Sequence, residues 1–362
     1  MKIVVTGTRG IPGIQGGVET HCEELFYRIV DADHEVIVVR RKNYIVPGLE
    51  ADRYKGVIIK DLSNLVSKHF EAFMHTLAAV LYAKRVHADI VHIHAVGPSI
   101  MTPIARLLGM KVVCTHHGPD YDRQKWGRFA KSILRLGERW GMKYANAAIV
   151  ISKHIQGIVN TKYPSQKNVH LIYNGVNLPQ PSPDDYLQQL GVSGQRYILA
   201  VGRLVKEKGF DLLLDAYERL DDKSVRLVIA GDADHSDAYS CSLKERARKA
   251  GAVLTGYIQK DKLVQLYQGS ELFVLPSYHE GLPISLLEAM SCRCNVLVSD
   301  IPANAEVGLD SDRYFKCGNS DKLYQGILHR LAHADRCTYD MHLYDWDVIA
   351  DQTKKVYDSL MR

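Results

Sequence analysis

The stretch LFVLPSYHEGLPISLLE, residues 272–288, decides the fold that we expect for this chain. An apolar run ends at Leu275, a loop with glycine and proline follows, and a helical apolar pattern begins at Pro283. The order is therefore strand, loop and helix. Pro283 suits the first helical turn, and residues 284–286 would then present free backbone amides at the positive end of the helix. Such a helix start binds phosphate.

Two carboxylates, Glu280 and Glu288, flank this expected phosphate site. Carboxylates do not bind phosphate, because like charges repel. We expect them instead to hold sugar hydroxyls on either side of the phosphate. The stretch therefore predicts a site for a nucleotide-sugar.

Similar units repeat along the chain. Apolar, β-branched runs alternate with helix-length segments: KIVVTG, EVIVVR, VIIKDL, DIVHIHA, KVVCTHH, AAIVIS, YILAVG, VRLVIAG, LFVLPS and NVLVSD. This alternation predicts an α/β fold of parallel strands covered by helices on both faces, the Rossmann-like doubly wound arrangement. Residues 171–183 are rich in Pro, Asn and Gly and form the expected linker. We expect domains at 1–175 and 176–345, with a helix over about 346–362 that packs on either domain.

Composition narrows the class of protein. The chain has 362 residues, which suits two domains, and its seven cysteines include no CxxC pair, which favours reduced thiols. No uninterrupted apolar stretch is long enough for a membrane span, and Met1 leads directly into a strand pattern without a signal peptide. We expect a cytoplasmic protein without disulfides.

Charge is unevenly distributed. Residues 1–175 contain 24 Lys and Arg against 14 Asp and Glu, a net charge of +10, whereas the remainder carries −5. The cationic half would attract an anionic partner, such as lipid headgroups, phosphorylated substrates or nucleic acid.

Within that half, residues 128–144 predict an amphipathic helix. Five basic residues fall on one arc and five apolar residues on the adjoining face: Arg128, Lys131, Arg135, Arg139 and Lys143, then Phe129, Ile133, Leu136, Trp140 and Tyr144. Such a helix can lie on an anionic bilayer, which would place the protein peripherally on the inner face of the plasma membrane. An ordinary helix with a solvated outer face is the alternative. Nucleic acid is disfavoured, because no second basic surface interleaves aromatic residues.

The amino terminus, MKIVVTGTRGIPGIQGG, offers a rival function. Its glycines match the short-chain dehydrogenase fingerprint, Arg40 and Arg41 could accommodate a 2′-phosphate, and Tyr121 with Lys125 has the spacing of that family's catalytic pair. The helix, however, is expected to start near residue 17, which is late for a dinucleotide-binding turn. On a third interpretation, the glycines only permit a tight loop.

A second loop, residues 202–209, follows one strand run and precedes a helix. Arg203 and Lys208 on this loop can converge on a diphosphate and so replace a divalent metal. The alternative is a solvated loop with both side chains in water.

Histidines end two strands of the first half. His94, His116 and His117 lie at carboxyl ends of strands, where doubly wound folds bind ligands, whereas His92 is expected in the core. Each could instead be a structural histidine bonded to the backbone. A zinc site built from them lacks an ordered ligand spacing.

Several motifs together resemble one family. GRLVKEKGFDLLLDAY, AGDADHSD, TGYIQ, PSYHEGLPISLLEAM and VSDIPANAEV are similar to the donor-binding half of retaining GT-B glycosyltransferases, the large group 1 family. GTRGIPGIQGGVET and THHGPDYDRQKWG resemble a rhamnosyltransferase-like subgroup that makes bacterial cell-surface polysaccharides, including lipopolysaccharide. The resemblance spans nearly the whole chain.

This resemblance implies catalytic roles for four residues. Arg203 and Lys208 would neutralise the donor diphosphate as the nucleoside diphosphate leaves. Glu280 would contact the donor sugar, as would His117 through the family's His-Gly pair. Glu288 would bind the ribose.

The resemblance also implies backbone contacts with the donor. The distal phosphate would be held by a short run at the helix start: Gly281, Leu282, Pro283, Ile284 and Ser285. Gly16 and Gly17 would let the amino-terminal backbone approach the phosphate and the acceptor, and Tyr257 and Ile258 would lie near a base that is uracil, guanine or thymine.

A metal-independent, retaining sugar transfer is the function that these features imply. The donor would be a UDP-, GDP- or dTDP-sugar, the acceptor a glycan or a lipid-diphosphate-linked glycan, and no cofactor is expected. Asp232 and Asp234 could suggest a metal-binding pair of another glycosyltransferase fold, but we interpret them as loop caps after a strand. A sugar-nucleotide epimerase on the same two-domain fold remains a further alternative.

Overall fold

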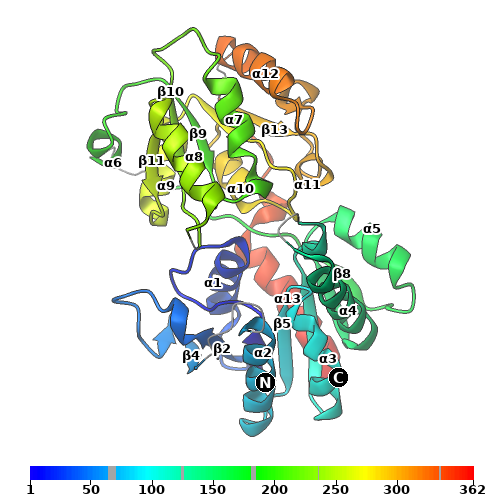
Figure 1. The fold of residues 1–362 in the computed structure, drawn as a ribbon. Coiled ribbons are helices and arrows are strands. Elements are labelled where there is room, and N and C mark those ends of the chain that lie inside the picture. Colours follow the sequence, from blue (N-terminus) through cyan, green and yellow to red (C-terminus); the bar gives the residue numbers. More distant parts are fainter. Residues whose placement is uncertain (64–70, 124–125, 181–184, 235, 334–335) are drawn as a thin grey trace. The chain divides into compact units, whose positions relative to one another are not determined.

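The computed structural model describes residues 1–63, 71–123, 126–180, 185–234, 236–333 and 336–362. The chain forms two compact units, one of Met1–Gly175 with Leu343–Arg362 and the other of Val176–His342 (Figure 1). The first unit ends its main segment at the boundary expected near residue 175. The closing helix, whose partner the sequence left open, belongs to the first unit.

Unit 1 is built on an eight-stranded sheet with the order β3-β4-β2-β1-β5-β6-β7-β8. All neighbours pair in parallel except β3, which is antiparallel to β4. The strands are β1 (Lys2–Thr6), β2 (Glu35–Arg41), β3 (Arg53–Tyr54), β4 (Val57–Leu62), β5 (Ile90–His94), β6 (Lys111–His116), β7 (Ala147–Val150) and β8 (Val169–Leu171).

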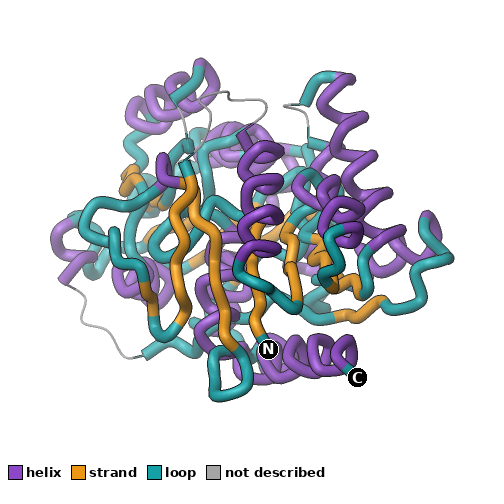
Figure 2. Tube along the Cα trace, turned by 90° about the horizontal axis from the view of Figure 1, so that it is seen from below, coloured by secondary structure: helices purple, strands orange, loops and turns teal. Residues whose placement is uncertain are grey.

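Helices flank this sheet. They are α1 (Gly17–Ile29), α2 (Glu71–Arg85), α3 (Thr102–Leu107), α4 (Arg128–Tyr144), α5 (Lys153–Lys162) and α13 (Trp346–Met361), with short 3₁₀ turns at Lys42–Tyr44, Pro98–Met101 and Asp120–Asp122. Helix α13 shares a core with α1 and the first strands, in which Phe26, Trp346 and Tyr357 are buried. Figure 2 shows the two chain ends on the same side of this unit.

Unit 2 has a six-stranded parallel sheet with the order β11-β10-β9-β12-β13-β14. Its strands are β9 (Tyr197–Val201), β10 (Arg226–Ala230), β11 (Val253–Gly256), β12 (Leu272–Leu275), β13 (Val296–Ser299) and β14 (Tyr314–Phe315). Its helices are α6 (Asp185–Gln189), α7 (Phe210–Tyr217), α8 (Ala238–Lys249), α9 (Lys260–Gly269), α10 (Ile284–Ser291), α11 (Pro302–Ala305) and α12 (Ser320–Ala332), with 3₁₀ turns at Lys206–Lys208, Ser311–Arg313 and, at the boundary, His342–Tyr344. The predicted α/β class is confirmed.

The strand order reverses once in each sheet. In unit 1 the chain moves outward from β1 to β2 and β4, then returns to place β5 on the other side of β1. In unit 2 the same reversal places β12 beside β9. Ligands of doubly wound sheets bind at the carboxyl ends of the strands beside such a reversal. The loops after β1, β5, β9 and β12 are therefore where a site is expected.

Helix α4 packs on unit 1 through glycines instead of through its aromatic face. A Cβ added at Gly137 would lie 2.2 Å from the carbonyl oxygen of Val96, and one at Gly141 would lie 2.7 Å from the Cβ of Ser99. Of the apolar stripe, Phe129, Leu136 and Tyr144 are exposed, whereas Ile133 and Trp140 are half-buried. Among the described residues, none of the helices combines the length and hydropathy that a membrane crossing requires.

A buried carboxylate anchors the same helix. Glu138 accepts hydrogen bonds from Nε2 of His116 at 2.9 Å, from the Tyr121 hydroxyl at 2.8 Å and from the Tyr163 hydroxyl at 2.7 Å. Burial alone would raise the pKa of Glu138, but the bonds from His116 and Tyr163 outweigh it and lower the pKa to about 2. The ionised carboxylate therefore holds β6, α4 and α5 together.

Replacing Gly137 with Ala should destabilise unit 1, because the new methyl group meets the backbone of Val96 and α4 must shift. We expect a loss of about 1–3 kcal/mol. The matched control is Gly157→Ala in α5, where nothing lies within 4 Å and helix propensity predicts a small gain. All three tryptophans belong to unit 1, so urea unfolding followed by tryptophan fluorescence measures this unit. Equal stability of both variants would contradict the packing described.

The depressed pKa of Glu138 also predicts a dependence of stability on pH. A carboxyl group whose pKa is lower in the folded state contributes fully above its unfolded value, near 4.5, and loses that contribution as the pH falls toward 2. Unfolding in urea between pH 7 and pH 3 should thus show a weaker pH dependence for Glu138→Gln than for the wild type. The control Glu35→Gln, at a half-exposed side chain, should follow the wild-type curve. Parallel curves for the wild type and Glu138→Gln would disprove the role of the carboxylate.

Candidate functional site

Two loops meet at the strand reversal of unit 2. The loop after β9 and the loop after β12 are joined by a hydrogen bond from the Tyr278 amide to the Glu207 carbonyl, at 2.8 Å. Gly209 has a φ of 65°, and a Cβ there would lie 2.2 Å from the carbonyl oxygen of Pro276. Only glycine combines this left-handed backbone with so close an approach. The loops that carry the predicted cations and acids are therefore in contact.

An ion pair crosses this junction. The Nζ of Lys208 lies 2.6 Å from Oε1 of Glu280, and the Ser277 hydroxyl donates to the same oxygen at 2.7 Å. The side chains of Lys208 and Glu280 are only 17% and 11% exposed. The structure thus joins two residues predicted from the sequence that lie 72 positions apart.

The second cation also has a carboxylate partner. Arg203 donates from a terminal guanidinium nitrogen to Asp234 at 2.7 Å. Asp232 accepts the amide of the next residue, Ala233, and pairs with Lys244. Asp232 therefore caps the loop as predicted, whereas Asp234 holds Arg203, a role that was not foreseen. Arg203 and Lys208 are thus each paired with a carboxylate, whereas the solvated-loop alternative has both side chains in water.

Helix α10 begins one residue later than the sequence suggested. Pro283 is the N-cap, with φ −73° and ψ 115°, and its side chain makes no capping hydrogen bond. The prediction of a free amide at Leu286 is wrong, because this amide donates to the Pro283 carbonyl at 3.1 Å. Ile284 and Ser285 contribute the amides at the helix start, after the loop residues Gly281 and the buried Leu282.

A tyrosine positions the second acid. The hydroxyl of Tyr267 on α9 donates to Glu288 at 3.0 Å and lies 3.1 Å from the Ser285 carbonyl. Tyr267 is buried, and burial with the nearby carboxylate raises the pKa of its hydroxyl. Nothing in the local sequence singles out Tyr267, since an aromatic residue in a helix usually indicates only a core position. Tyr257, 49% exposed, and Ile258 follow the edge strand β11.

Three histidines gather in unit 1. His94 ends β5, His117 follows β6 and His21 lies on α1. The Nδ1 of His94 is 2.9 Å from Nε2 of His117, and the ring of His21 meets that of His117 edge-on at 4.9 Å between centroids. Burial lowers the pKa of all three, for His21 to about 4, so the rings are neutral near pH 7. His21 carries no signal in the local sequence.

Two other histidines of strands β5 and β6, His92 and His116, have structural roles. His92 is fully buried and bonds to the hydroxyls of Tyr357 and Thr115, each at 2.6 Å, as expected of a core residue. His116 accepts the Gly118 amide at Nδ1 and therefore donates to Glu138 from Nε2. His116 thus takes the structural role that the sequence left open, and it is not part of the histidine group.

The amino-terminal loop folds back onto α1. Arg9 bonds through its backbone amide and its Nε to Glu19, each at 3.1 Å. Burial would raise the pKa of Glu19, but the charge and hydrogen bonds of Arg9 outweigh it and lower the pKa. Gly16, with φ 146°, is the N-cap, and α1 begins at Gly17, where a Cβ would meet open space. Side chains added at Gly17 would be tolerated sterically, whereas Gly16 lies against Glu19.

Two residues that a dinucleotide-binding site would use, Arg40 and Tyr121, are engaged elsewhere. Arg40 is fully buried and bonds to Asp61 at 2.7 Å and to the Leu49 carbonyl at 2.8 Å, so it is not open to a 2′-phosphate. Tyr121 is bound to Glu138, and Lys125 lies outside the described residues. These contacts weigh against the dehydrogenase alternative.

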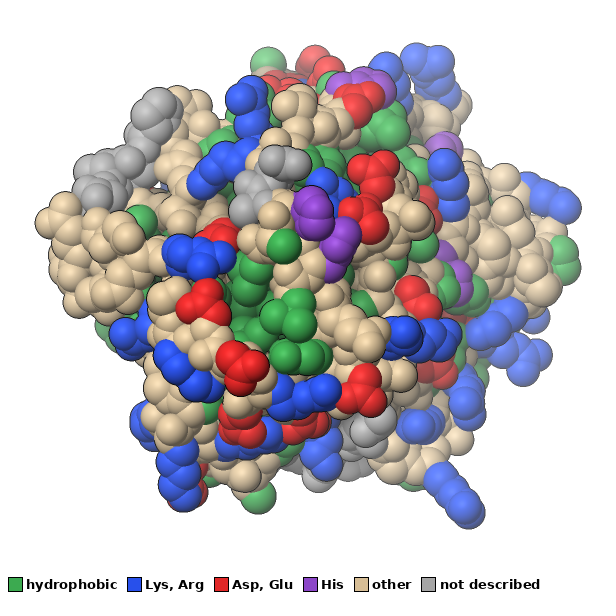
Figure 3. Space-filling view, turned by 90° about the horizontal axis from the view of Figure 1, so that it is seen from above, with side chains coloured by type: hydrophobic (Ala, Val, Ile, Leu, Met, Phe, Trp, Pro, Cys, Tyr) green, Lys and Arg blue, Asp and Glu red, His purple; other side chains and the backbone are tan. Residues whose placement is uncertain are grey.

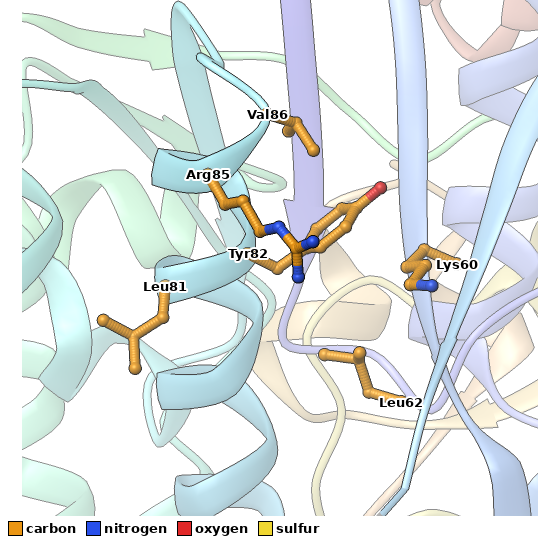
Figure 4. A pocket seen from close by; sticks show the side chains of 6 residues that line it. All are labelled: Lys60, Leu62, Leu81, Tyr82, Arg85 and Val86. Carbon is orange, nitrogen blue, oxygen red and sulfur yellow. The ribbon is translucent and has the colours of Figure 1, made fainter.

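A pocket of about 600 Å³ lies apart from the predicted site residues. Its lining comes from β4 and α2, with the cations Lys60 and Arg85 beside Leu62 and Tyr82 (Figure 4). None of the residues that the motifs singled out lines it. The face shown in Figure 3 has no patch of a single charge, because acidic and basic side chains are interspersed over it.

Comparisons with known proteins agree with this arrangement. The family model described as glycosyl transferases group 1 matches residues 184–336, and the model of glycosyltransferase family 4 matches residues 15–180. An uncharacterised glycosyltransferase of Methanocaldococcus jannaschii is 26% identical, over 100% of this chain and 99% of its own length. The alpha-maltose-1-phosphate synthase of Mycolicibacterium smegmatis is 27% identical, over 75% of this chain and 79% of its own length.

Solved structures show the same fold. Sucrose-phosphate synthase from Thermosynechococcus elongatus matches with a TM-score of 0.84 at 18% identity, over 99% of both chains. Anabaena HepE in complex with UDP-glucose matches with a TM-score of 0.79 at 19% identity, over 99% of this chain and 100% of its own. With two doubly wound units, two matching family models and these relatives, the chain belongs to the group 1 glycosyl transferases and has the GT-B fold.

Proposed function

We propose that this glycosyltransferase moves a sugar, with retention and without a metal, from a nucleotide diphosphate sugar to a glycan or lipid-diphosphate-linked acceptor in bacterial cell-surface polysaccharide synthesis. One observation carries the donor half of the proposal. The Lys208–Glu280 pair crosses the strand reversal of unit 2, in the loop that leads to the amino-terminal end of α10, whose N-cap is a proline. Cation, carboxylate and helix start are the three parts that a sugar diphosphate needs.

Arg203 and Lys208 supply the positive charge for the diphosphate. Each is now held by a carboxylate, Asp234 and Glu280 respectively. A diphosphate would take over these cations, because its oxygens accept the same charge-assisted hydrogen bonds. As the nucleoside diphosphate leaves, negative charge grows on it, and cations already fixed in place stabilise that charge without further reorganisation. This accounts for catalysis without a divalent ion.

The two acids then act on the sugars. Once Lys208 turns to the phosphate, Glu280 is available for hydroxyls of the transferred sugar, and Glu288, which Tyr267 orients, for the ribose. The amides of Ile284 and Ser285 would hold the distal phosphate at the helix start. In this assignment both acids are positioning groups, and neither transfers a proton.

By resemblance to the family, His117 and the amino-terminal glycines of unit 1 would also contact the substrates. A neutral imidazole can donate a hydrogen bond to a sugar hydroxyl, and the pKa of His117 is lowered by burial, which keeps the ring neutral. Gly16 and Gly17 would admit the phosphate and the acceptor close to the backbone. For retention we favour attack from the face of the leaving group, with the departing phosphate taking the proton of the acceptor hydroxyl.

A relative supports the type of acceptor. An enzyme of Campylobacter jejuni, 28% identical over 49% of this chain and 48% of its own length, is the N,N'-diacetylbacillosaminyl-diphospho-undecaprenol alpha-1,3-N-acetylgalactosaminyltransferase. Its acceptor is named as a sugar on a lipid diphosphate. An acceptor of this chemistry stays at a membrane, so the transferase would work on a membrane surface.

Helix α4 provides a surface for that position. Phe129, Leu136 and Tyr144 are exposed, and the basic residues Arg128, Arg135, Arg139 and Lys143 lie beside them, also exposed. The buried residues of the helix are Gly137, Glu138, Gly141 and Met142. Ile133 and Trp140 of the apolar stripe are half-buried, which agrees with the alternative of an ordinary helix with a solvated outer face. Aromatic residues beside cations favour binding to anionic lipid.

The donor site is tested by charge-removing variants. Arg203→Ala, Lys208→Ala and Glu280→Gln should each lower kcat/KM. The decrease should correspond to a loss of about 2–4 kcal/mol of transition-state stabilisation. The matched control is Lys206→Ala on the same loop, an exposed lysine that should keep nearly full activity. Sugar transfer is measured with UDP-, GDP- and dTDP-sugars after the productive donor has been found by thermal stabilisation. Near-normal turnover in all three site variants would disprove the assignment.

Membrane association is tested by flotation with liposomes. The wild type should float with vesicles that contain anionic lipid and remain free of neutral vesicles. Phe129→Ala combined with Leu136→Ala should abolish most of this binding, whereas the control Leu107→Ala, at an 87% exposed leucine of α3, should not. Equal flotation of the double variant and the control would leave α4 without a membrane role.

A further inference from the structure

The histidine group of unit 1 has the composition of a metal site. One ring nitrogen from each of His21, His94 and His117 lies within 4.8 Å of the other two. The three rings come from a helix, a strand end and the residue after the neighbouring strand, so they are fixed by separate elements of the fold. Nothing in the proposed sugar transfer uses His21 or His94.

His21 already has the orientation of a ligand. Its Nδ1 lies 3.0 Å from the side-chain oxygen of Asn174. An amide oxygen only accepts hydrogen bonds, so Nδ1 of His21 carries the proton and Nε2 keeps its lone pair. Histidines that bind metal typically donate their other N–H to a carbonyl or carboxylate in this way. The bond to Asn174 thus sets the tautomer of His21 and leaves Nε2 as the nitrogen that can bind an ion.

His94 and His117 lie against each other. His94 is fully buried, and its Nδ1 faces Nε2 of His117 at 2.9 Å. A single proton lies between these two nitrogens, and an ion bound between them would replace it. Nε2 of His94, which has no hydrogen-bond partner among the described residues, would then carry the proton of that ring.

The chemistry of the donors selects the ligand. Three imidazoles without a carboxylate suit Zn²⁺ and its neighbours Co²⁺, Ni²⁺ and Cu²⁺, whereas Mg²⁺ and Ca²⁺ prefer oxygen. Nitrogens bound to Zn²⁺ at about 2.0–2.1 Å in a tetrahedron are about 3.3 Å apart. The separation of 2.9 Å between Nδ1 of His94 and Nε2 of His117 needs only a small opening, whereas the nitrogen of His21, within 4.8 Å of both, must approach them to bind the same ion.

We propose that His21, His94 and His117 bind one Zn²⁺ ion, with a fourth position open to water or an anion. The ion would occupy the imidazole of His117, which the proposed function assigns to the donor sugar. Zinc would therefore inhibit sugar transfer. The inhibition rests on the proposed function, whereas the binding of the ion does not.

Metal binding is measured first, without any sugar substrate. Full-length protein freed of metal by chelation should bind one equivalent of Zn²⁺ in calorimetry, and Co²⁺ should give the visible absorption of a four-coordinate ion. His21→Ala should weaken binding by at least about 100-fold and Asn174→Ala by about 10–100-fold. His87→Asn, at an exposed histidine of the same unit, should bind like the wild type. Thermal unfolding without metal establishes that each variant is folded.

The outcomes separate the two claims. Absence of tight Zn²⁺ binding by the wild type, or equal affinity in His21→Ala and His87→Asn, overturns the zinc site even if the donor-site variants behave as expected. Stoichiometric binding that leaves sugar transfer unchanged supports the zinc site and removes His117 from the proposed transfer. Binding together with inhibition that His21→Ala relieves supports both.

Discussion

The parallel pairing of strands is the constraint on which the remaining structure depends. Parallel neighbours need a crossover through a helix, so the carboxyl ends of all such strands lie along one edge, and the loops that follow them become neighbours. Three glycines allow these loops to touch. A Cβ at Gly7 would lie 2.2 Å from the carbonyl oxygen of His94, one at Gly231 2.1 Å from that of Gly202, and one at Gly209 2.2 Å from that of Pro276. In both units, backbone without side chains makes room for the functional groups at this edge.

Charge compensation shapes what these groups can do. Lys208 with Glu280, and Arg203 with Asp234, keep cations in a partly buried place without a bound anion. Removing one partner of such a pair leaves the other charge uncompensated, which is more harmful than the loss of an exposed pair. In the proposed function a diphosphate would take over these cations, and the two ion pairs would keep the cations in place before the donor arrives. Glu280, which holds Lys208, would then become available for sugar hydroxyls.

Local patterns predicted the elements, and contacts between distant residues supplied the remainder. The runs of β-branched residues gave the strands, and the glycine loop with Pro283 gave the start of α10 to within one residue. The bond of His21 to Asn174 spans 153 positions, and no periodicity encodes it. Tyr267 resembles any core aromatic until its hydroxyl is seen to reach Glu288. The periodicity of α4 found its two stripes but not the face that packs, because that face is defined by the absence of side chains at Gly137 and Gly141.

Two adjacent histidines show how a structural contact prepares a functional one. His116 accepts the Gly118 amide and donates to Glu138 on α4, which fixes the backbone on both sides of residue 117. The side chain of His117 then faces the other way, toward His94 at the end of the neighbouring strand. The position of this imidazole consequently depends on α4, through Glu138 and His116. Glycine contacts and one buried carboxylate hold α4 in unit 1, and cations and aromatic residues lie on its outward face. Its inward face positions the imidazole that the proposed sugar transfer requires.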